Sequence, residues 1–166
     1  MIRVDIETII MASGGVPSVI VLRERSSSTH TEPAGRALSI QTGTYEAAAI
    51  GQGISGERKG RPITHDLFVS TLHDLGSKVA RVEICRVDAP LFYASLVLLD
   101  QDGAEHVLDA RPSDALALAV RSNAPIYVED DVMNRAGSTA PQTEQDTEEE
   151  LELFNRFVQT LSPDDF

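Results

Sequence analysis

Apolar and polar residues alternate near the start of the chain, a pattern typical of half-buried strands. A Ser-Gly-Gly turn separates the first two alternating segments, and a loop rich in Ser and Thr precedes a third. An alanine-rich segment with helical spacing follows, although its glycines weaken it. We therefore predict three strands and then a helix, at residues 2–10, 16–24, 36–40 and 44–54.

The second half of the chain repeats this order after one extra helix. Thr64 is the predicted cap of that helix, residues 65–75, and Gly76 ends it. We expect its buried face to contain Leu67, Thr71, Leu72 and Leu75. Three strands, a helix, a strand and a short helix should follow, at residues 78–87, 91–99, 104–109, 112–122, 125–129 and from 130. The Asp-Gln-Asp-Gly sequence at 100–103 predicts a hairpin turn.

Two segments of the chain align with each other, which indicates an internal duplication. Residues 39–51 match residues 107–119 at an offset of 68, with Glu46 opposite Asp114. Each segment is a strand, a short turn and a helix that opens with an acid and alanines. We interpret this as a diverged β-β-β-α duplication. The predicted fold is α+β, with a mixed, mostly antiparallel sheet and helices packed on it.

The C-terminal part of the chain differs from the rest in charge. Residues 129–166 contain eleven acids and two bases, a net charge of −9 out of −12 for the whole chain. We predict an α+β domain at residues 1–136, a flexible linker at 137–146, and an acidic helix and tail at 147–166. The helix presents an apolar stripe at helical spacing, formed by Leu151, Phe154, Val158 and Leu161. The near-neutral body lacks the strongly basic footprint of a dedicated nucleic-acid binder.

Cys85 is the chain's one cysteine, so an internal disulfide is excluded. It lies in a predicted strand, which favours a buried thiol over a nucleophile. No segment has the layout of a signal peptide, and the apolar runs are too short to span a membrane. We therefore expect a cytoplasmic protein with no membrane partner.

Residues 109–114, with the sequence DARPSD, lie where a predicted strand gives way to a helix. Pro112 suits the first helical position and forces Arg111 to be extended, while Asp114 meets the positive helix end. Asp109 and Arg111 have two interpretations. One is a structural ionic cluster. The other is a phosphate site, in which Arg111 binds a phosphodiester and Asp109 or Asp114 binds a divalent cation such as Mg²⁺.

His65 and Asp66 occupy the first turn of the extra helix. A helix N terminus favours Asp66 but disfavours a protonated imidazole, so His65 is either an ordinary surface histidine or a general base. The turn before it contains three bases that would steer phosphates if they are more than a solvated turn, namely Arg58, Lys59 and Arg61. Phe92 and Tyr93 point to opposite faces of a strand, so one packs in the core and the other stacks on a base or fills an oligomer interface.

The motifs RPITHDL, LFYASLVLLDQDG and DARPSDALALAVRSNAPIYV, with the spacing between them, resemble the bifunctional nuclease domain family. The resemblance covers roughly residues 1–135 and implies an α+β nuclease acting on RNA, DNA or both, often as an oligomer. The family's polar motif positions fall on Glu46, His65, Asp66, Asp109, Arg111, Ser113 and Asp114.

Two functions are therefore open. The first is a metal-assisted nuclease, with His65, Asp66, Asp109, Arg111, Asp114 and Glu46 as catalytic residues. In this case Arg58, Lys59, Arg61, Ser113 and Tyr93 would bind substrate. The second is a non-catalytic binding or regulatory module that retains the fold. A homo-oligomer, most simply a homodimer, is expected in either case, because apolar strands such as ASLVLL and exposed sheet edges need cover.

Overall fold

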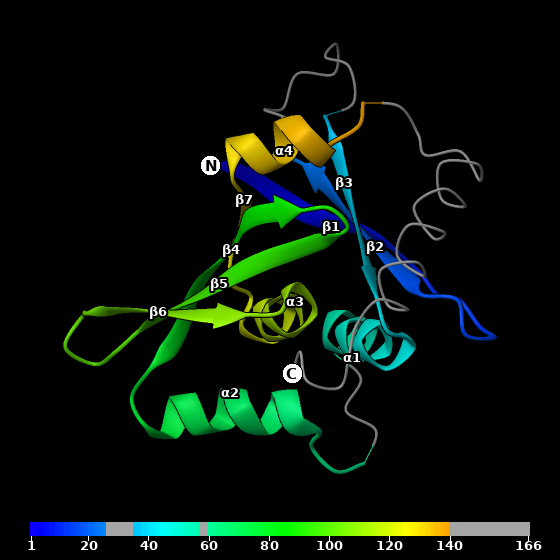
Figure 1. Ribbon diagram of the computed structural model, residues 1–166. Coiled ribbons are helices and arrows are strands. Elements are labelled where there is room, and N and C mark those ends of the chain that lie inside the picture. The colour runs from blue at the N-terminus through cyan, green and yellow to red at the C-terminus, as the bar shows by residue number, and fades with distance from the viewer. Residues whose placement is uncertain (26–34, 57–59, 140–166) are drawn as a thin grey trace, which may run out of the picture.

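The computed structural model describes residues 1–25, 35–56 and 60–139, and these residues build one seven-stranded sheet (Figure 1). Its order is β3-β2-β1-β7-β4-β5-β6. The strands are β1 Ile2–Ile10, β2 Ser18–Glu24, β3 Ala37–Thr42, β4 Lys78–Asp88, β5 Leu91–Leu99, β6 Glu105–Ala110 and β7 Ile126–Val128. Neighbouring strands pair antiparallel except β4 and β7, which pair in parallel. The prediction of a mixed, mostly antiparallel α+β fold is confirmed.

The sheet consists of two similar halves that meet at β7. In the first half β1, β2 and β3 form a meander that leads into helix α1 (Thr44–Ser55). In the second half β4, β5 and β6 form a meander that leads into helix α3 (Pro112–Ser122). Helix α2 (Thr64–Asp74) connects the halves, and helix α4 (Asp130–Ala136) follows β7. This topology agrees with the predicted β-β-β-α duplication.

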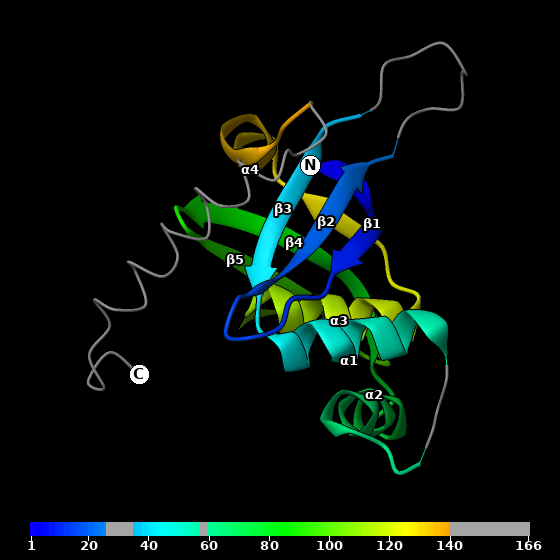
Figure 2. The same cartoon turned by 90° about the vertical axis from the view of Figure 1, so that its right-hand side faces the viewer.

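The helices are arranged around the ends of the strands. Figure 2 shows α1 and α3 side by side at one end of the sheet, with α2 beyond them and α4 at the opposite end. Period-two alternation directs one set of strand side chains into the main core, including Ile20, Leu22, Val82, Ile84 and Leu96. Helix α3 adds the buried residues Leu116 and Leu118 to the same core. Within the described ranges no helix is long and apolar enough to cross a membrane.

Two predictions about α2 are wrong. The helix begins at Thr64 itself, and its N-cap is Ile63, whose backbone N–H donates to the Asp66 carboxylate at 2.9 Å. The expected buried face is largely exposed, since Leu67 and Leu75 have 63% and 69% of their surface accessible. Leu72 and Val69 are the partly buried residues that pack on the core. The predicted stop is correct, because Gly76 follows the helix with a φ of +71°.

The predicted strand ASLVLL belongs to β5, an interior strand whose Leu96, Val97 and Leu98 are buried within this chain. It therefore does not need a second subunit to cover it. Near the start of the predicted linker, Ser138 forms an antiparallel bridge with Ala37 of β3. The rest of the linker and the acidic tail, residues 140–166, lie outside the described residues.

Candidate functional site

Helices α1 and α3 begin at equivalent positions of the two halves, and each has an acid in its first turn. Pro112 is the first residue of α3, and its N-cap Arg111 is extended, with φ −66° and ψ 142°, as predicted. Gly43 is the equivalent N-cap of α1. The third residues of the two helices are Glu46 and Asp114, the pair that the sequence repeat aligns.

Arg111 lies between these two acids. Its Nε donates to Asp114 Oδ2 at 2.8 Å and its Nη2 to Oδ1 at 3.3 Å, so one edge of the guanidinium is held by Asp114. Its Nη1 lies 3.6 Å from Glu46 Oε1. The Arg111 side chain is 68% exposed, whereas Glu46 and Asp114 are 30% and 37% exposed. Two half-buried carboxylates therefore hold the Arg111 guanidinium, which is exposed to solvent.

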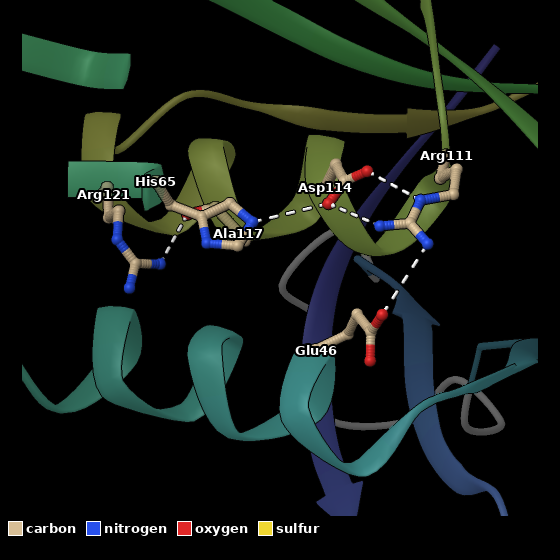
Figure 3. A network of polar contacts seen from close by, with 6 residues as sticks. All are labelled: Glu46, His65, Arg111, Asp114, Ala117 and Arg121. Atoms are coloured by element: carbon tan, nitrogen blue, oxygen red, sulfur yellow. Dashed lines mark hydrogen bonds and ion pairs between the residues drawn. The ribbon is translucent and has the colours of Figure 1, made fainter. Parts of the chain in front are cut away.

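His65 joins the same network from the first turn of α2 (Figure 3). Its Nε2 lies 3.4 Å from Asp114 Oδ1, and the ring is 19% exposed. Its Nδ1 is buried and has no hydrogen-bond partner among the described residues. Nε2 is therefore the nitrogen that faces the cluster. We call Glu46, His65, Arg111 and Asp114 the polar cluster.

The network shifts the ionisation of two of its members. Burial acts to raise the pKa of Asp114, but hydrogen bonds and charge from Arg111, then His65, outweigh it and leave the pKa lowered. The hydrogen bond that Arg111 donates to the Asp114 carboxylate raises the pKa of Arg111. At neutral pH the cluster therefore contains a carboxylate and a guanidinium that are both firmly charged.

Asp66 faces away from this network, although it is adjacent to His65 in sequence. Its carboxylate accepts the Ile63 N–H and a 2.8 Å hydrogen bond from Arg121 Nε. Arg121 is 7% exposed and also donates to the Ala117 carbonyl at 2.8 Å. Arg121 was not among the site residues predicted from the sequence. Its position seven residues after Asp114, on the same face of α3, was the available signal.

Two glycines allow α1 to lie against the site. A Cβ at Gly53 would lie 2.4 Å from Val120 Cγ2 and 2.8 Å from Arg121 Nη1, so α1 and α3 approach closely only because Gly53 has no side chain. A Cβ at Gly43 would lie 2.2 Å from Glu46 Oε2. The Glu46 carboxylate thus folds back over the start of its own helix and occupies the space that a side chain at position 43 would take.

Comparison with known proteins identifies the family of the chain. A model of the bifunctional nuclease domain matches residues 28–141. The chain belongs to the bifunctional nuclease domain family. Two uncharacterized proteins, from two strains of Mycobacterium tuberculosis, are each 36% identical over 154 residues, which is 89% of this chain and 87% of each relative. The family match includes all four residues of the polar cluster.

Two predicted site residues of this bifunctional nuclease domain lie on the opposite face of the sheet from the main core. Asp109 pairs with Ser95, between Leu96 and Ala94, whose side chains point into the core. In the described part of the chain no hydrogen bond or ion pair joins Asp109 to the polar cluster. Tyr93 also points outward, and the Arg86 guanidinium lies 3.8 Å from its ring centroid. Phe92 packs on the core, as expected of one of the two aromatics.

The remaining predicted substrate-binding residues do not lie together in the structure. Ser113 is buried in the first turn of α3. Arg61 is exposed and lines a groove of about 450 Å³ between α1 and α2. This groove is also lined by Gln52, Pro62, Ile63, Asp66 and Arg121. Arg58 and Lys59 lie outside the described residues.

The polar cluster does not fit a divalent cation. Mg²⁺ and Ca²⁺ require several oxygen ligands, but both oxygens of Asp114 already accept hydrogen bonds from Arg111. Asp109, the other predicted ligand, projects from the opposite face of the sheet. Across residues 1–25, 35–56 and 60–139, no group of three or more His, Cys, Asp or Glu side chains is placed to hold a metal ion. We therefore derive no chemical step through a cation.

Proposed function

We propose that this bifunctional nuclease domain hydrolyses phosphodiester bonds in RNA, DNA or both at the polar cluster. The observation that carries the proposal is the convergence of three helix starts on one site. Glu46 of α1, His65 of α2 and Asp114 of α3 all belong to first turns. Glu46 and Asp114 contact the exposed Arg111, and His65 contacts Asp114. Helix N termini and an arginine favour a bound anion. Two acids and a histidine provide groups for proton transfer.

Each residue of the polar cluster then has a role in phosphodiester cleavage. Arg111 binds the phosphate through its Nη1 side, because Asp114 holds the Nε–Nη2 edge. Asp114 is a positioning residue that orients Arg111 and His65. His65 exchanges a proton at Nε2, the nitrogen that faces the cluster. Glu46, with its carboxylate 3.6 Å from Arg111, orients the attacking water.

The groove beside α2 offers a place for the part of the substrate strand that flanks the cleaved bond. Ile63 and Asp66 line the groove, and His65 lies between them in sequence but faces Asp114. The groove and the polar cluster thus lie on different sides of the first turn of α2. We propose that the flanking phosphates lie along the groove near Arg61. Arg58 and Lys59, which lie outside the described residues, come shortly before Arg61 in the sequence and add positive charge there.

The alternative function, a binding module without catalysis, is favoured by a different observation. Asp114 takes one edge of Arg111, and Asp109 is on the other face of the sheet. The polar cluster therefore has fewer side-chain groups available for catalysis than the sequence predicted. Such a site would bind a phosphate at Arg111 without cleaving it.

Activity measurements with matched variants test the proposal. Purified protein would be incubated with single-stranded RNA and DNA oligonucleotides, with Mg²⁺ and separately with EDTA. We expect His65→Ala to reduce turnover by about 100-fold or more, as for loss of a general acid or base, while oligonucleotide affinity changes little. His73→Ala is the control, since His73 is on the same helix and is 89% exposed.

Arg111→Lys keeps the charge but loses the planar guanidinium, so it should reduce both cleavage and affinity. The control is Arg135→Lys, since Arg135 is 54% exposed and pairs with Asp131 one helical turn away. Binding that depends on Arg111, with no cleavage of either nucleic acid, would instead establish the binding module. Normal cleavage by both His65→Ala and Arg111→Lys would refute the assignment of the site.

We also propose that the protein is cytoplasmic and homo-oligomeric. The single cysteine is consistent with a reducing compartment. Strand β6 supports the oligomer, because it is an edge of the sheet and exposes Val107 and Leu108, which are 62% and 43% accessible.

A further inference from the structure

The sheet has a second buried apolar cluster on the outer face of β2 and β3. Its members are Val19, Val21 and Ala37, with 4%, 8% and 6% of their surface accessible. They alternate along the strands with residues of the main core such as Ile20 and Leu38. Period-two alternation therefore places them on the face that points away from that core. We call them the outer cluster.

None of the described helices covers the outer cluster with apolar side chains. Its members come from strands alone, and the buried residues Ile50, Leu116 and Met133 of α1, α3 and α4 belong to the main core. Helix α2 has no buried residue. Gln41 faces the same side as Val19, and its buried Oε1 has no hydrogen-bond partner within the described ranges. Something else must cover this face.

Three segments lie outside the described residues, and their composition indicates which of them covers the outer cluster. Residues 26–34 read SSSTHTEPA and residues 57–59 read ERK, so neither offers large apolar side chains. Residues 147–161 carry Leu151, Phe154, Val158 and Leu161 at helical spacing. We propose that this C-terminal segment packs as a helix against the outer cluster of its own chain.

The path of the chain supports this occupant. Ser138 exchanges two backbone hydrogen bonds with Ala37, at 2.7 and 2.8 Å, so the chain leaves the described fold beside a member of the outer cluster. The eight residues from 139 to 146 reach at most about 29 Å. A helix of residues 147–161 would be about 22 Å long. The strand β3 spans about 20 Å, so the segment matches the face in both reach and length.

Methyl NMR of the full chain tests the proposal directly. We expect nuclear Overhauser effects between the methyl groups of Val19 and Val21 and the aromatic ring of Phe154. In a mixture of differently labelled chains, the effects should be intramolecular. Effects found only between chains would mean that a second copy provides the cover, and no effect at all would also overturn the proposal.

A matched pair of variants adds a second measurement. Phe154→Glu places a charge in the stripe, so it should shift the Val19 and Val21 methyl signals and reduce the amide-exchange protection of β3 by about tenfold or more. Gln159→Glu adds the same charge outside the stripe and should change neither. If Phe154→Glu does not fold, the wild-type Overhauser effects still decide. These results do not depend on nuclease activity.

Discussion

Replacing Gly53 by alanine tests the close contact on which the site depends. In a helix, Gly→Ala adds about 1 kcal/mol to the free energy of unfolding when there is room for the methyl group. At Gly53 there is no room, because the new Cβ would lie 2.4 Å from Val120 Cγ2. Val120 has few rotamers in a helix, and Arg121 is held by Asp66 and Ala117. Overpacking of this kind costs about 1 to 3 kcal/mol.

Gly51 provides the control within the same helix. A Cβ at Gly51 meets nothing within 4 Å, so Gly51→Ala should gain the full helix propensity of about 1 kcal/mol. We therefore expect urea denaturation to show Gly53→Ala less stable than Gly51→Ala by about 1 to 3 kcal/mol. Equal stabilisation by the two substitutions would refute the close-packing argument.

The same pair links packing to the proposed activity. Moving α1 away from α3 would lengthen the 3.6 Å contact between Glu46 and Arg111, so Gly53→Ala should also lower cleavage. Gly51→Ala should not. A stable Gly53→Ala protein that cleaves normally would show that Glu46 is not needed at that distance.

Two further predictions concern charge. The lowered pKa of Asp114 means that its stabilising contribution is present above the ordinary carboxyl range and is lost as the pH falls through the lowered value. The difference in unfolding free energy between wild type and Asp114→Asn should therefore shrink as the pH falls below about 4, and urea titrations at pH 7 and pH 3 would check this. The acidic tail should repel nucleic acid, so replacing Glu148, Glu149 and Glu150 by Gln should strengthen binding to single-stranded oligonucleotides at low salt. Fluorescence anisotropy should show the gain disappearing as salt rises, and equal affinities at low salt would contradict it.

Much of the fold was predictable because its signals are local. The alternation in β1 and β2, the turn before β6 and the proline at the start of α3 each depend on neighbouring residues. The internal repeat also predicted more than strands. It aligned Glu46 with Asp114, and the structure places these two acids on either side of Arg111.

The predictions that failed concern features that depend on contacts between residues far apart in the sequence. The stripe of α2 has helical spacing, but spacing alone does not show whether another element covers it, and Leu67 and Leu75 are exposed. Asp109 is close to Arg111 in sequence, yet strand alternation turns it to the other face of the sheet. Arg121 pairs with Asp66 across 55 residues, so no local pattern linked the two.

The shortest strand has a consequence for the order of folding. β7 has three residues, and it pairs with β1 near the start of the chain and with β4 in the middle. The first meander therefore cannot join the second until residues 126–128 are available, which requires closing a loop of more than 120 residues. Contacts between such distant residues slow folding. During synthesis the N-terminal meander leaves the ribosome well before its partner strand, so completion of the sheet must be a late step.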